Sequence, residues 1–170
     1  MNEVAPVVFQ KLNEMGIEPP YVEHPCANTM EDCRAAEAAL GALMPKNIFL
    51  TPRNRSAYYL LIVRPDARFK TADISKQLGV SRLSFAPEEA LSELLHTYGG
   101  AITPMGLLFD DNRAVRVVID SALREAPVLA FHPCDNAASL AVTNDDFFGR
   151  FLPTLGYLPT YVEIHDFIEN

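Results

Sequence analysis

The sequence predicts a single α+β domain in which helices pack against a mixed, largely antiparallel β-sheet. Three observations favour this class: helical and extended signals alternate along the chain, short apolar runs are separated by turn-forming residues, and 49% of the 170 residues are hydrophobic. A chain of this length can bury one sizeable core and is too short for two. We therefore expect residues 1–170 to form one domain.

The first third of the chain carries start and stop signals for helices and a turn signal for a hairpin. Gly16 follows a run of apolar residues at helical spacing and is suited to end a helix. Thr29, with Asp32 three residues later, resembles an N-cap. The cluster Pro52-Arg53-Asn54-Arg55 separates two apolar runs and is typical of a turn. The expected elements are helices over 7–15 and 29–40, a strand over 21–23, and a hairpin of strands over 48–51 and 57–63.

The rest of the chain continues this alternation. Gly79 is suited to end one helix and Pro87 to begin the next, and Thr143 or Asn144 is suited to cap a further one. Residues 110–113 resemble a hairpin turn between two apolar runs. The expected elements are helices over 71–78, 87–95 and 144–152, and strands over 107–109, 115–119, 128–131, 140–142 and 161–164.

A glycine-rich segment, from Tyr98 to Leu108, is the strongest local feature. The pair Gly99-Gly100 can adopt positive φ and lets backbone amides approach a ligand closely. Pro104 fixes its own φ and biases Thr103 toward an extended conformation. The segment is expected to turn and run directly into the strand over 107–109, with its N–H groups aimed at a carbonyl or an anion. The alternative is an ordinary tight turn before a strand.

Lys46 stands at the beginning of an apolar strand and is a candidate ligand-binding cation. It can hold a carbonyl, a carboxylate or a phosphate, or it can serve only to discourage pairing at a strand edge. Asn47 alternates to the opposite face of a regular strand. From the strand pattern alone, Asn47 is expected to act as a turn residue or a structural hydrogen-bonding group.

His132 begins a polar loop that follows an apolar strand. It is a candidate general base or hydrogen-bond donor to a substrate, and the alternative is a structural histidine. Two other possibilities remain open for this loop. His24, Cys26, His132 and Cys134 together could bind zinc, and Cys134 could act as a nucleophile beside His132.

Composition limits the class of partner. The net charge of −8 argues against a general nucleic-acid binder, and we expect no DNA partner. Residues 46–82 nevertheless carry eight basic and two acidic side chains, which predicts a local site for a polyanion. The sequence has no signal-peptide pattern and no apolar run long enough to cross a membrane. With three cysteines that lack disulfide-scaffold spacing, we expect a cytoplasmic protein with free thiols and no membrane partner.

Three blocks, in this order, resemble the YbaK/ProX-type aminoacyl-tRNA deacylase family, and in particular free-standing homologues of the prolyl-tRNA synthetase editing domain. The blocks are Pro45-Lys46-Asn47-Ile48-Phe49-Leu50, then residues 100–108, then Phe131-His132-Pro133 with Asn136 and Ala138-Ser139-Leu140. The resemblance extends from His24 to the last expected strand.

The resemblance implies hydrolysis of the ester that joins a wrong amino acid, with alanine as the expected one, to tRNA for proline, without a metal or other cofactor. It implies the tRNA acceptor end as the partner, with prolyl-tRNA synthetase as a candidate second partner. It assigns catalytic roles to Lys46, Gly100 and His132, with a ribose hydroxyl helping to activate water. A non-catalytic tRNA- or synthetase-binding regulator and a hydrolase of another small ester or nucleotide are the alternatives. The substrate-binding residues that we expect are Thr29, Met30, Asn47, Gly99, Ala101, Ile102, Thr103 and Pro104.

Overall fold

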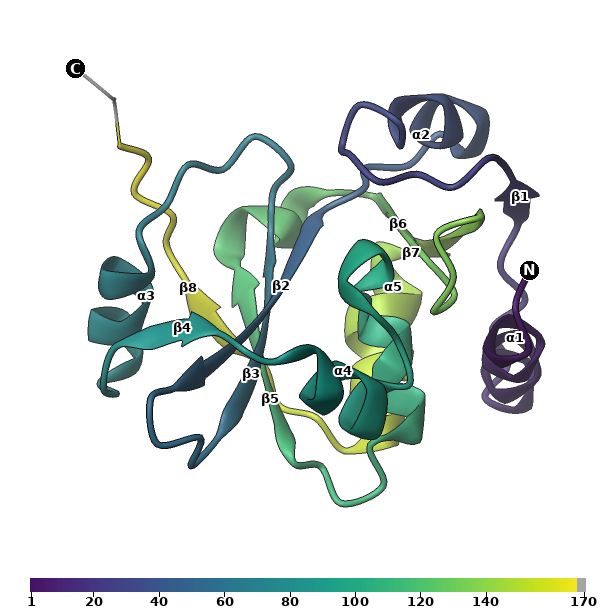
Figure 1. The fold of residues 1–170 in the computed structure, drawn as a ribbon. Helices are drawn as coiled ribbons and strands as arrows, with labels where there is room; N and C mark the ends of the chain where they lie inside the picture. Colours follow the sequence, from purple (N-terminus) through teal and green to yellow (C-terminus); the bar gives the residue numbers. More distant parts are fainter. Residues whose placement is uncertain (168–170) are drawn as a thin grey trace.

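A five-stranded mixed sheet forms the centre of the molecule, of which this computed structural model describes residues 1–167 (Figure 1). Across the sheet the strands are β4 (Leu83–Phe85), β2 (Lys46–Pro52), β3 (Tyr58–Val63), β5 (Val115–Asp120) and β8 (Thr160–Val162). The β4, β2 and β3 strands pair antiparallel, whereas β3, β5 and β8 pair parallel. The predicted α+β class with a mixed sheet is therefore confirmed.

A second, three-stranded antiparallel sheet lies beside the first and is joined to it through one residue. Its strands are β1 (Tyr21–Glu23), β7 (Ala138–Thr143) and β6 (Val128–Phe131), in that order. The Leu43 N–H donates to the Val128 carbonyl at 3.0 Å, and the Leu43 carbonyl accepts from the Ala130 N–H at 2.8 Å. Because this bridge is parallel, the chain that enters β2 runs alongside the end of β6.

Helices cover both faces of the five-stranded sheet, with α3 on one side and α4 and α5 on the other (Figure 1). In β3, Leu60 and Ile62 belong to the core cluster that contains the α4 side chains, whereas Leu61 and Val63 belong to the cluster that contains Ile74 of α3. A strand buried on both faces has a continuous apolar run instead of an alternating one. The helices are α1 (Val4–Glu14), α2 (Arg34–Leu40), α3 (Thr71–Leu78), α4 (Glu88–Leu95), α5 (Asn144–Asp146) and α6 (Leu152–Leu155).

Several local predictions are confirmed. The β2–β3 hairpin forms around residues 53–57. Gly16 and Gly79 follow helices with φ of 80° and 67°, the left-handed conformation that glycine adopts without strain. The Thr143 hydroxyl accepts the Asp146 N–H at 3.1 Å, which is the predicted cap. The helix that it opens continues from α5 through a π-helical stretch (Phe147–Phe151) into α6.

The predicted strand over 107–109 is wrong. The predicted turn over 110–113 forms, with the Arg113 N–H donating to the Asp110 carbonyl at 3.0 Å, but it does not connect a hairpin. Residues Pro104–Phe109 form a 3₁₀ helix, in which the Thr103 hydroxyl accepts the Met105 N–H at 3.2 Å and Pro104 occupies the first turn. Thr-Pro was thus a helix-start signal. Gly106 lets this helix pack directly against α4, because a Cβ there would lie 2.5 Å from the Leu95 carbonyl oxygen.

Two further boundaries differ from expectation. The helix predicted to start at Thr29 begins at Arg34, because Thr29 and Asp32 instead close a separate turn. In that turn the Asp32 N–H donates to the Thr29 hydroxyl at 3.2 Å, and the Thr29 N–H donates to the Asp32 carboxylate at 2.9 Å. The three-residue strand β4 was not predicted. Within residues 1–167, none of the helices has the length and apolar character needed to cross a membrane.

Gly106→Ala tests the close packing of the 3₁₀ helix on α4. The new methyl group would overlap the Leu95 carbonyl, so we expect a loss of about 3 kcal/mol in the free energy of unfolding, measured by urea denaturation. Gly149→Ala is the matched control, because a Cβ there meets nothing within 4 Å. It is expected to be neutral or to stabilise by up to about 1 kcal/mol. Equal stability of both variants and the parent protein would contradict this packing.

Candidate active site

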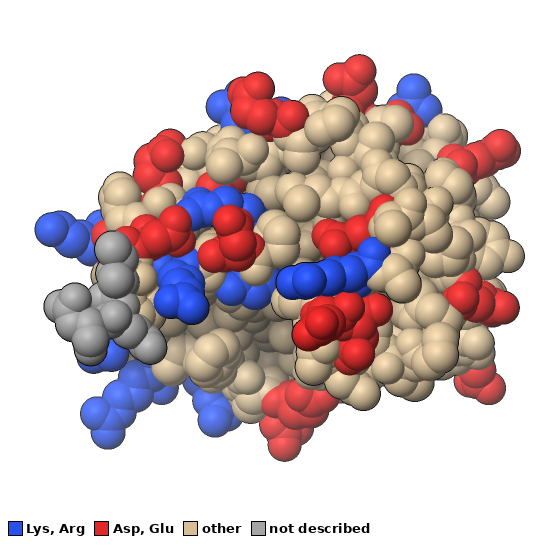
Figure 2. Space-filling view, turned by 90° about the horizontal axis from the view of Figure 1, so that it is seen from above, with Lys and Arg blue, Asp and Glu red and all other residues tan. Residues whose placement is uncertain are grey.

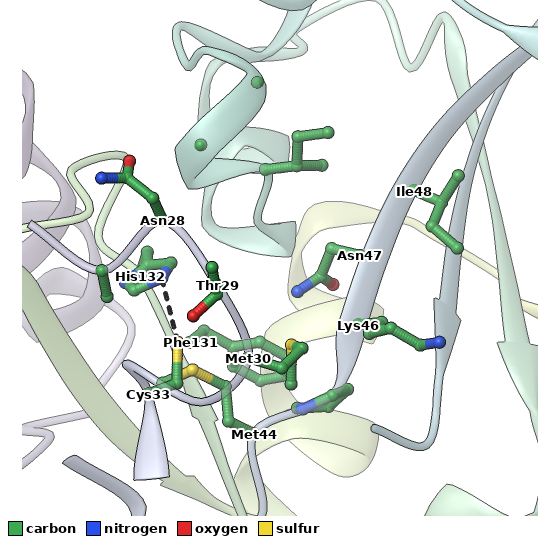
Figure 3. Close-up of a pocket in the computed structure, with 15 residues that line it drawn as sticks. Asn28, Thr29, Met30, Cys33, Met44, Lys46, Asn47, Ile48, Phe131 and His132 are labelled. Atoms are coloured by element: carbon green, nitrogen blue, oxygen red, sulfur yellow. Dashed lines mark hydrogen bonds between the residues drawn. The ribbon is translucent and has the colours of Figure 1, made fainter. Parts of the chain in front are cut away.

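A cavity of about 200 Å³ opens where the start of β2 lies beside the end of β6 (Figure 3). Four parts of the chain form its walls: the segment before α2, the entry to β2, the glycine-rich segment and the end of β6. The lining residues are Ala27, Asn28, Thr29, Met30, Cys33, Met44, Pro45, Lys46, Asn47, Ile48, Gly99, Gly100, Ile102, Phe131 and His132.

Eight of the eleven predicted site residues line this cavity: Thr29, Met30, Lys46, Asn47, Gly99, Gly100, Ile102 and His132. The other three, Ala101, Thr103 and Pro104, are buried behind it. The Ala101 carbonyl accepts the Thr97 hydroxyl at 2.6 Å, and Thr103 and Pro104 begin the 3₁₀ helix. These three residues shape the loop from behind and do not line the cavity.

Lys46 and Asn47 point to opposite sides of β2, as alternation requires, but the side that faces the cavity is that of Asn47 (Figure 3). The Lys46 ammonium extends away from the cavity and donates to the Ala67 carbonyl at 2.6 Å. An ammonium has three donors, so this bond leaves two of them available. The strand pattern identified both residues but not their orientation.

The Asn47 carboxamide has an unsatisfied acceptor. Its Oδ1 is buried and has no hydrogen-bond partner within residues 1–167, so the expectation from the strand pattern that Asn47 is a structural hydrogen-bonding group is wrong. An unpaired buried carbonyl oxygen costs free energy, about 1 to 3 kcal/mol. A ligand that donates a hydrogen bond to Asn47 would recover this cost.

The glycine-rich segment offers fewer free amides than its sequence suggested. Neither glycine has positive φ, because residues Gly99–Ala101 form a 3₁₀ turn. The Gly99 N–H donates to the Glu88 carboxylate at 2.9 Å, and the Ala101 N–H donates to the Tyr98 carbonyl at 2.9 Å. Within the described chain the Gly100 N–H has no acceptor and remains available to a ligand.

His132 is held as a neutral ring whose Nε2 keeps its lone pair. Its Nδ1 lies 2.8 Å from the Ala138 carbonyl, and because a carbonyl can only accept, Nδ1 carries the proton and Nε2 keeps its lone pair. The side chain is 8% exposed. Burial lowers the pKa of His132 below its usual value of 6.5, while the bond to Ala138 opposes this shift. The ring is therefore neutral at pH 7.

A second histidine lies behind His132. The two rings have centroids 6.1 Å apart, with Ser139 between them. The His24 Nδ1 lies 2.8 Å from the Pro25 carbonyl, so this nitrogen is the donor and Nε2 accepts the Ser139 hydroxyl at 2.8 Å. The Ser139 oxygen is in turn 3.5 Å from the His132 Nδ1. The pairing of Val22 with Ser139 between β1 and β7 brings His24 to this position.

The cysteine that lies near His132 Nε2 is Cys33, which was not predicted as a site residue. Its Sγ lies 4.0 Å from His132 Nε2 (Figure 3). Burial, together with Glu37 and Asp32, raises the pKa of the Cys33 thiol. It therefore stays protonated and can donate weakly to Nε2. No sequence signal marked this residue, because only the fold brings the start of α2 to the end of β6.

The hypotheses of a Cys134 nucleophile and of a zinc site that uses Cys134 are wrong. Cys134 is fully buried and its Sγ faces the Leu95 carbonyl at 3.8 Å. Burial raises the pKa of its thiol to about 12. In the part of the chain that the structure describes, no group of three or more His, Cys, Asp or Glu side chains is arranged to hold a metal ion.

The basic segment 46–82 does not form one continuous site. Because Lys46 pairs with Val63 and Pro52 pairs with Leu83, the segment divides into two groups at opposite ends of β2, about 20 Å apart at 3.3 Å per residue. Arg64 is paired with Asp66, Asp120 and Asp166. Figure 2 shows basic and acidic side chains interleaved on the face seen from above. Of the eight basic residues, one group consists of Lys46, Arg64, Arg68 and Lys70, the other consists of Arg53, Arg55 and Arg82, and Lys76 lies in α3.

The aminoacyl-tRNA editing domain family matches residues 24–149, a range that includes every residue lining the cavity. The chain belongs to this family. The resemblance of the three sequence blocks to the YbaK/ProX-type family is thus confirmed, and the cavity lies within the editing domain.

Several known proteins are similar to this chain over most of its length. Prolyl-tRNA synthetase associated domain-containing protein 1 of Bos taurus is 34% identical over 161 residues, which are 92% of this chain and 93% of the bovine protein. Prolyl-tRNA editing protein ProX of Acetoanaerobium sticklandii is 30% identical over 139 residues, covering 82% and 85% of the two chains. A crystal structure of a proposed trans-editing enzyme for prolyl-tRNA synthetase has the same fold, with a TM-score of 0.73, 18% identity, and coverage of 98% and 99%.

Thiol labelling at neutral pH tests the arrangement of the cysteines. The thiolate is the reactive form, so we expect exposed Cys26 to react quickly and buried Cys33 and Cys134 to react only after unfolding. Cys26→Ser should abolish the fast phase measured with a chromogenic disulfide reagent. Rapid labelling of Cys134 in the folded protein would contradict its burial.

Proposed function

We propose that this editing domain hydrolyses the ester of misacylated tRNA, with alanyl-tRNA for proline as the preferred substrate. The observation that carries the proposal is the arrangement of three polar groups around one small cavity: the Asn47 carboxamide, whose Oδ1 has no partner within residues 1–167, the Gly100 N–H, and His132 Nε2, which only the weakly donating Cys33 thiol approaches. An acceptor, a donor and a lone pair match the ammonium, the carbonyl and the attacking water of an aminoacyl ester.

Each group has a distinct role in this proposal. Asn47 Oδ1 accepts a hydrogen bond from the α-ammonium of the aminoacyl moiety. Water attacks the ester carbonyl, whose oxygen gains negative charge, and the Gly100 N–H donates to that oxygen as the bond to the ribose oxygen breaks. One preorganised amide donor is worth about 3 kcal/mol in such a transition state. No protein nucleophile is needed.

His132 and the terminal ribose supply the proton transfers. Water activation is shared between the lone pair of His132 Nε2 and the free ribose hydroxyl, and the proton taken from water passes to the departing ribose oxygen. Lys46, which retains two ammonium donors beyond its bond to Ala67, binds a phosphate of the terminal nucleotide. The acceptor end of tRNA for proline is the proposed partner, with prolyl-tRNA synthetase as the enzyme whose errors are corrected.

The size and lining of the cavity favour a small side chain. A volume of about 200 Å³ is below the range of about 300 to 1,000 Å³ that is usual for small-molecule sites. Met30, Met44, Ile102 and Phe131 supply an apolar wall suited to the alanine methyl group. A pocket too small for the proline ring excludes the correctly charged tRNA by size. Discrimination in the other direction, by the weaker binding of a side chain that lacks methylene groups, would be much less effective.

The direct test mixes the protein with alanyl-tRNA and prolyl-tRNA for proline and measures the loss of ester. We expect faster loss from the alanyl form. Asn47→Ala should lower kcat/KM about 10- to 100-fold, because a hydrogen bond to a charged group is worth about 1.5 to 3 kcal/mol. Asn54→Ala, in the β2–β3 turn, is the matched control and should keep full activity. Ester loss no faster than in buffer overturns the proposal, and a fully active Asn47→Ala overturns the role of Asn47.

The pH dependence of kcat/KM tests His132. Because burial lowers the pKa of His132 below 6.5, the Nε2 lone pair is present throughout the range above pH 6.5 and is lost on acidification below the lowered pKa. After subtraction of the uncatalysed rate, log kcat/KM should be level near neutrality and fall at acidic pH. His132→Gln should lower the rate and remove this acidic limb. An unchanged limb in His132→Gln would assign the titration to another group.

A further inference from the structure

Asn136 lies in the turn after His132 and is bonded to two other segments at once. Its Oδ1 accepts the Tyr98 hydroxyl at 2.9 Å, and its backbone N–H donates to the same Tyr98 oxygen at 3.0 Å. Its Nδ2 donates to Asn28 Oδ1 at 3.1 Å and to the Ala27 carbonyl at 3.4 Å, while its backbone carbonyl accepts the Ala27 N–H at 2.9 Å. The residue is 5% exposed, and its side-chain oxygen and nitrogen are both used.

The segments that Asn136 joins are the walls of the cavity. Tyr98 directly precedes the two glycines, and Asn28 directly precedes Thr29 and Met30. Asn136 itself does not line the cavity. It can therefore influence a ligand only through the residues that it holds.

The contact between Asn136 and the glycine-rich segment is close. A Cβ on Gly100 would lie 3.1 Å from Asn136 Nδ2 and 3.6 Å from Asn28 Oδ1. Gly100 therefore rests against the amide that links the two walls. The Tyr98 ring lies on the same side, with its Cε2 3.7 Å from that Cβ position, so a displacement of Asn136 or Tyr98 is expected to shift Gly100 and its free amide.

This polar cluster contributes little to the apolar core. Tyr98 is 36% exposed, and the bonds of Asn136 to Tyr98 and to Asn28 are only partly buried. A typical intramolecular hydrogen bond adds little net stability but strongly restricts geometry. The cluster is thus better suited to fix the relative positions of the walls than to hold the fold together.

We propose that Asn136 and Tyr98 are positioning residues that hold the Gly100 N–H and the segment 27–30 in register around the bound aminoacyl ester. This inference rests on the proposed function of the cavity. It predicts that release of the cluster misaligns the Gly100 donor with the carbonyl oxygen. Since the donor acts mainly on the charge that develops in the transition state, kcat should fall more than KM rises.

Tyr98→Phe is the sharpest variant, because it removes one hydroxyl and keeps the ring. We expect kcat for alanyl-tRNA deacylation to fall about 10- to 100-fold, the effect of the two hydrogen bonds to Asn136 that are lost with the hydroxyl, with KM nearly unchanged. Asn136→Ala should cause a larger loss, because it releases both walls. Tyr161→Phe is the matched control: Tyr161 is similarly exposed, at 37%, lies in β8, and should retain parent activity.

Amide hydrogen exchange provides a second readout that does not depend on catalysis. In Tyr98→Phe the Ala101 N–H, which closes the glycine-rich turn, should exchange about tenfold faster, while amides of the central strand β3 stay protected. Parent kcat in Tyr98→Phe overturns the positioning role, and so does accelerated exchange in β3, which would indicate general destabilisation. If the parent protein does not hydrolyse the ester at all, the proposed function itself fails, which is a distinct result.

Discussion

The site depends on the two backbone hydrogen bonds of Leu43, which fix the three-stranded sheet to the strand that enters the five-stranded one. Leu43 donates to Val128 and accepts from Ala130, so the chain passes from one sheet to the other within three residues. This parallel bridge brings the start of β2 alongside the end of β6. Lys46 and Asn47 on one side and His132 on the other are separated by more than eighty residues in sequence, yet they share one cavity because of this crossing.

The reactive groups of the cavity are defined largely by what their neighbours already bind. Glu88 occupies the Gly99 amide and the Tyr98 carbonyl occupies the Ala101 amide, which leaves the Gly100 N–H. The Ala138 carbonyl occupies one nitrogen of His132, which leaves the other with its lone pair and only the weak Cys33 thiol nearby. Because the neighbouring groups are already fixed by hydrogen bonds, few of them must reorganise when charge develops on a ligand. Preorganised groups of this kind can stabilise a transition state without a protein nucleophile.

The sequence predicted the parts of this arrangement that are local. The β2–β3 hairpin and the helix ends at Gly16, Gly79 and Thr143 follow from neighbouring residues, and the motif blocks contain Lys46, Gly100 and His132, which line the cavity. Alternation along β2 showed that Lys46 and Asn47 face opposite ways, but only the packing of the layers decides which one faces the cavity. The unequal roles of the two glycines depend on a carboxylate eleven residues earlier. The 3₁₀ helix after Thr103 was not predicted, because an apolar run of that length is compatible with either a strand or a helix.

The bond between the Lys46 ammonium and the Ala67 carbonyl has a consequence for the phosphate that we propose Lys46 to bind. A ligand that recruits this lysine must compete with a carbonyl already in place, so its apparent affinity is reduced by the fraction of time that the ammonium is free. A free phosphate makes no second contact that could offset this reduced affinity. A tethered phosphate, delivered next to an aminoacyl group already seated in the cavity, benefits from a high effective concentration. Under the proposed role of Lys46, this bond therefore favours a phosphate that is tethered to a seated aminoacyl group over a free small anion.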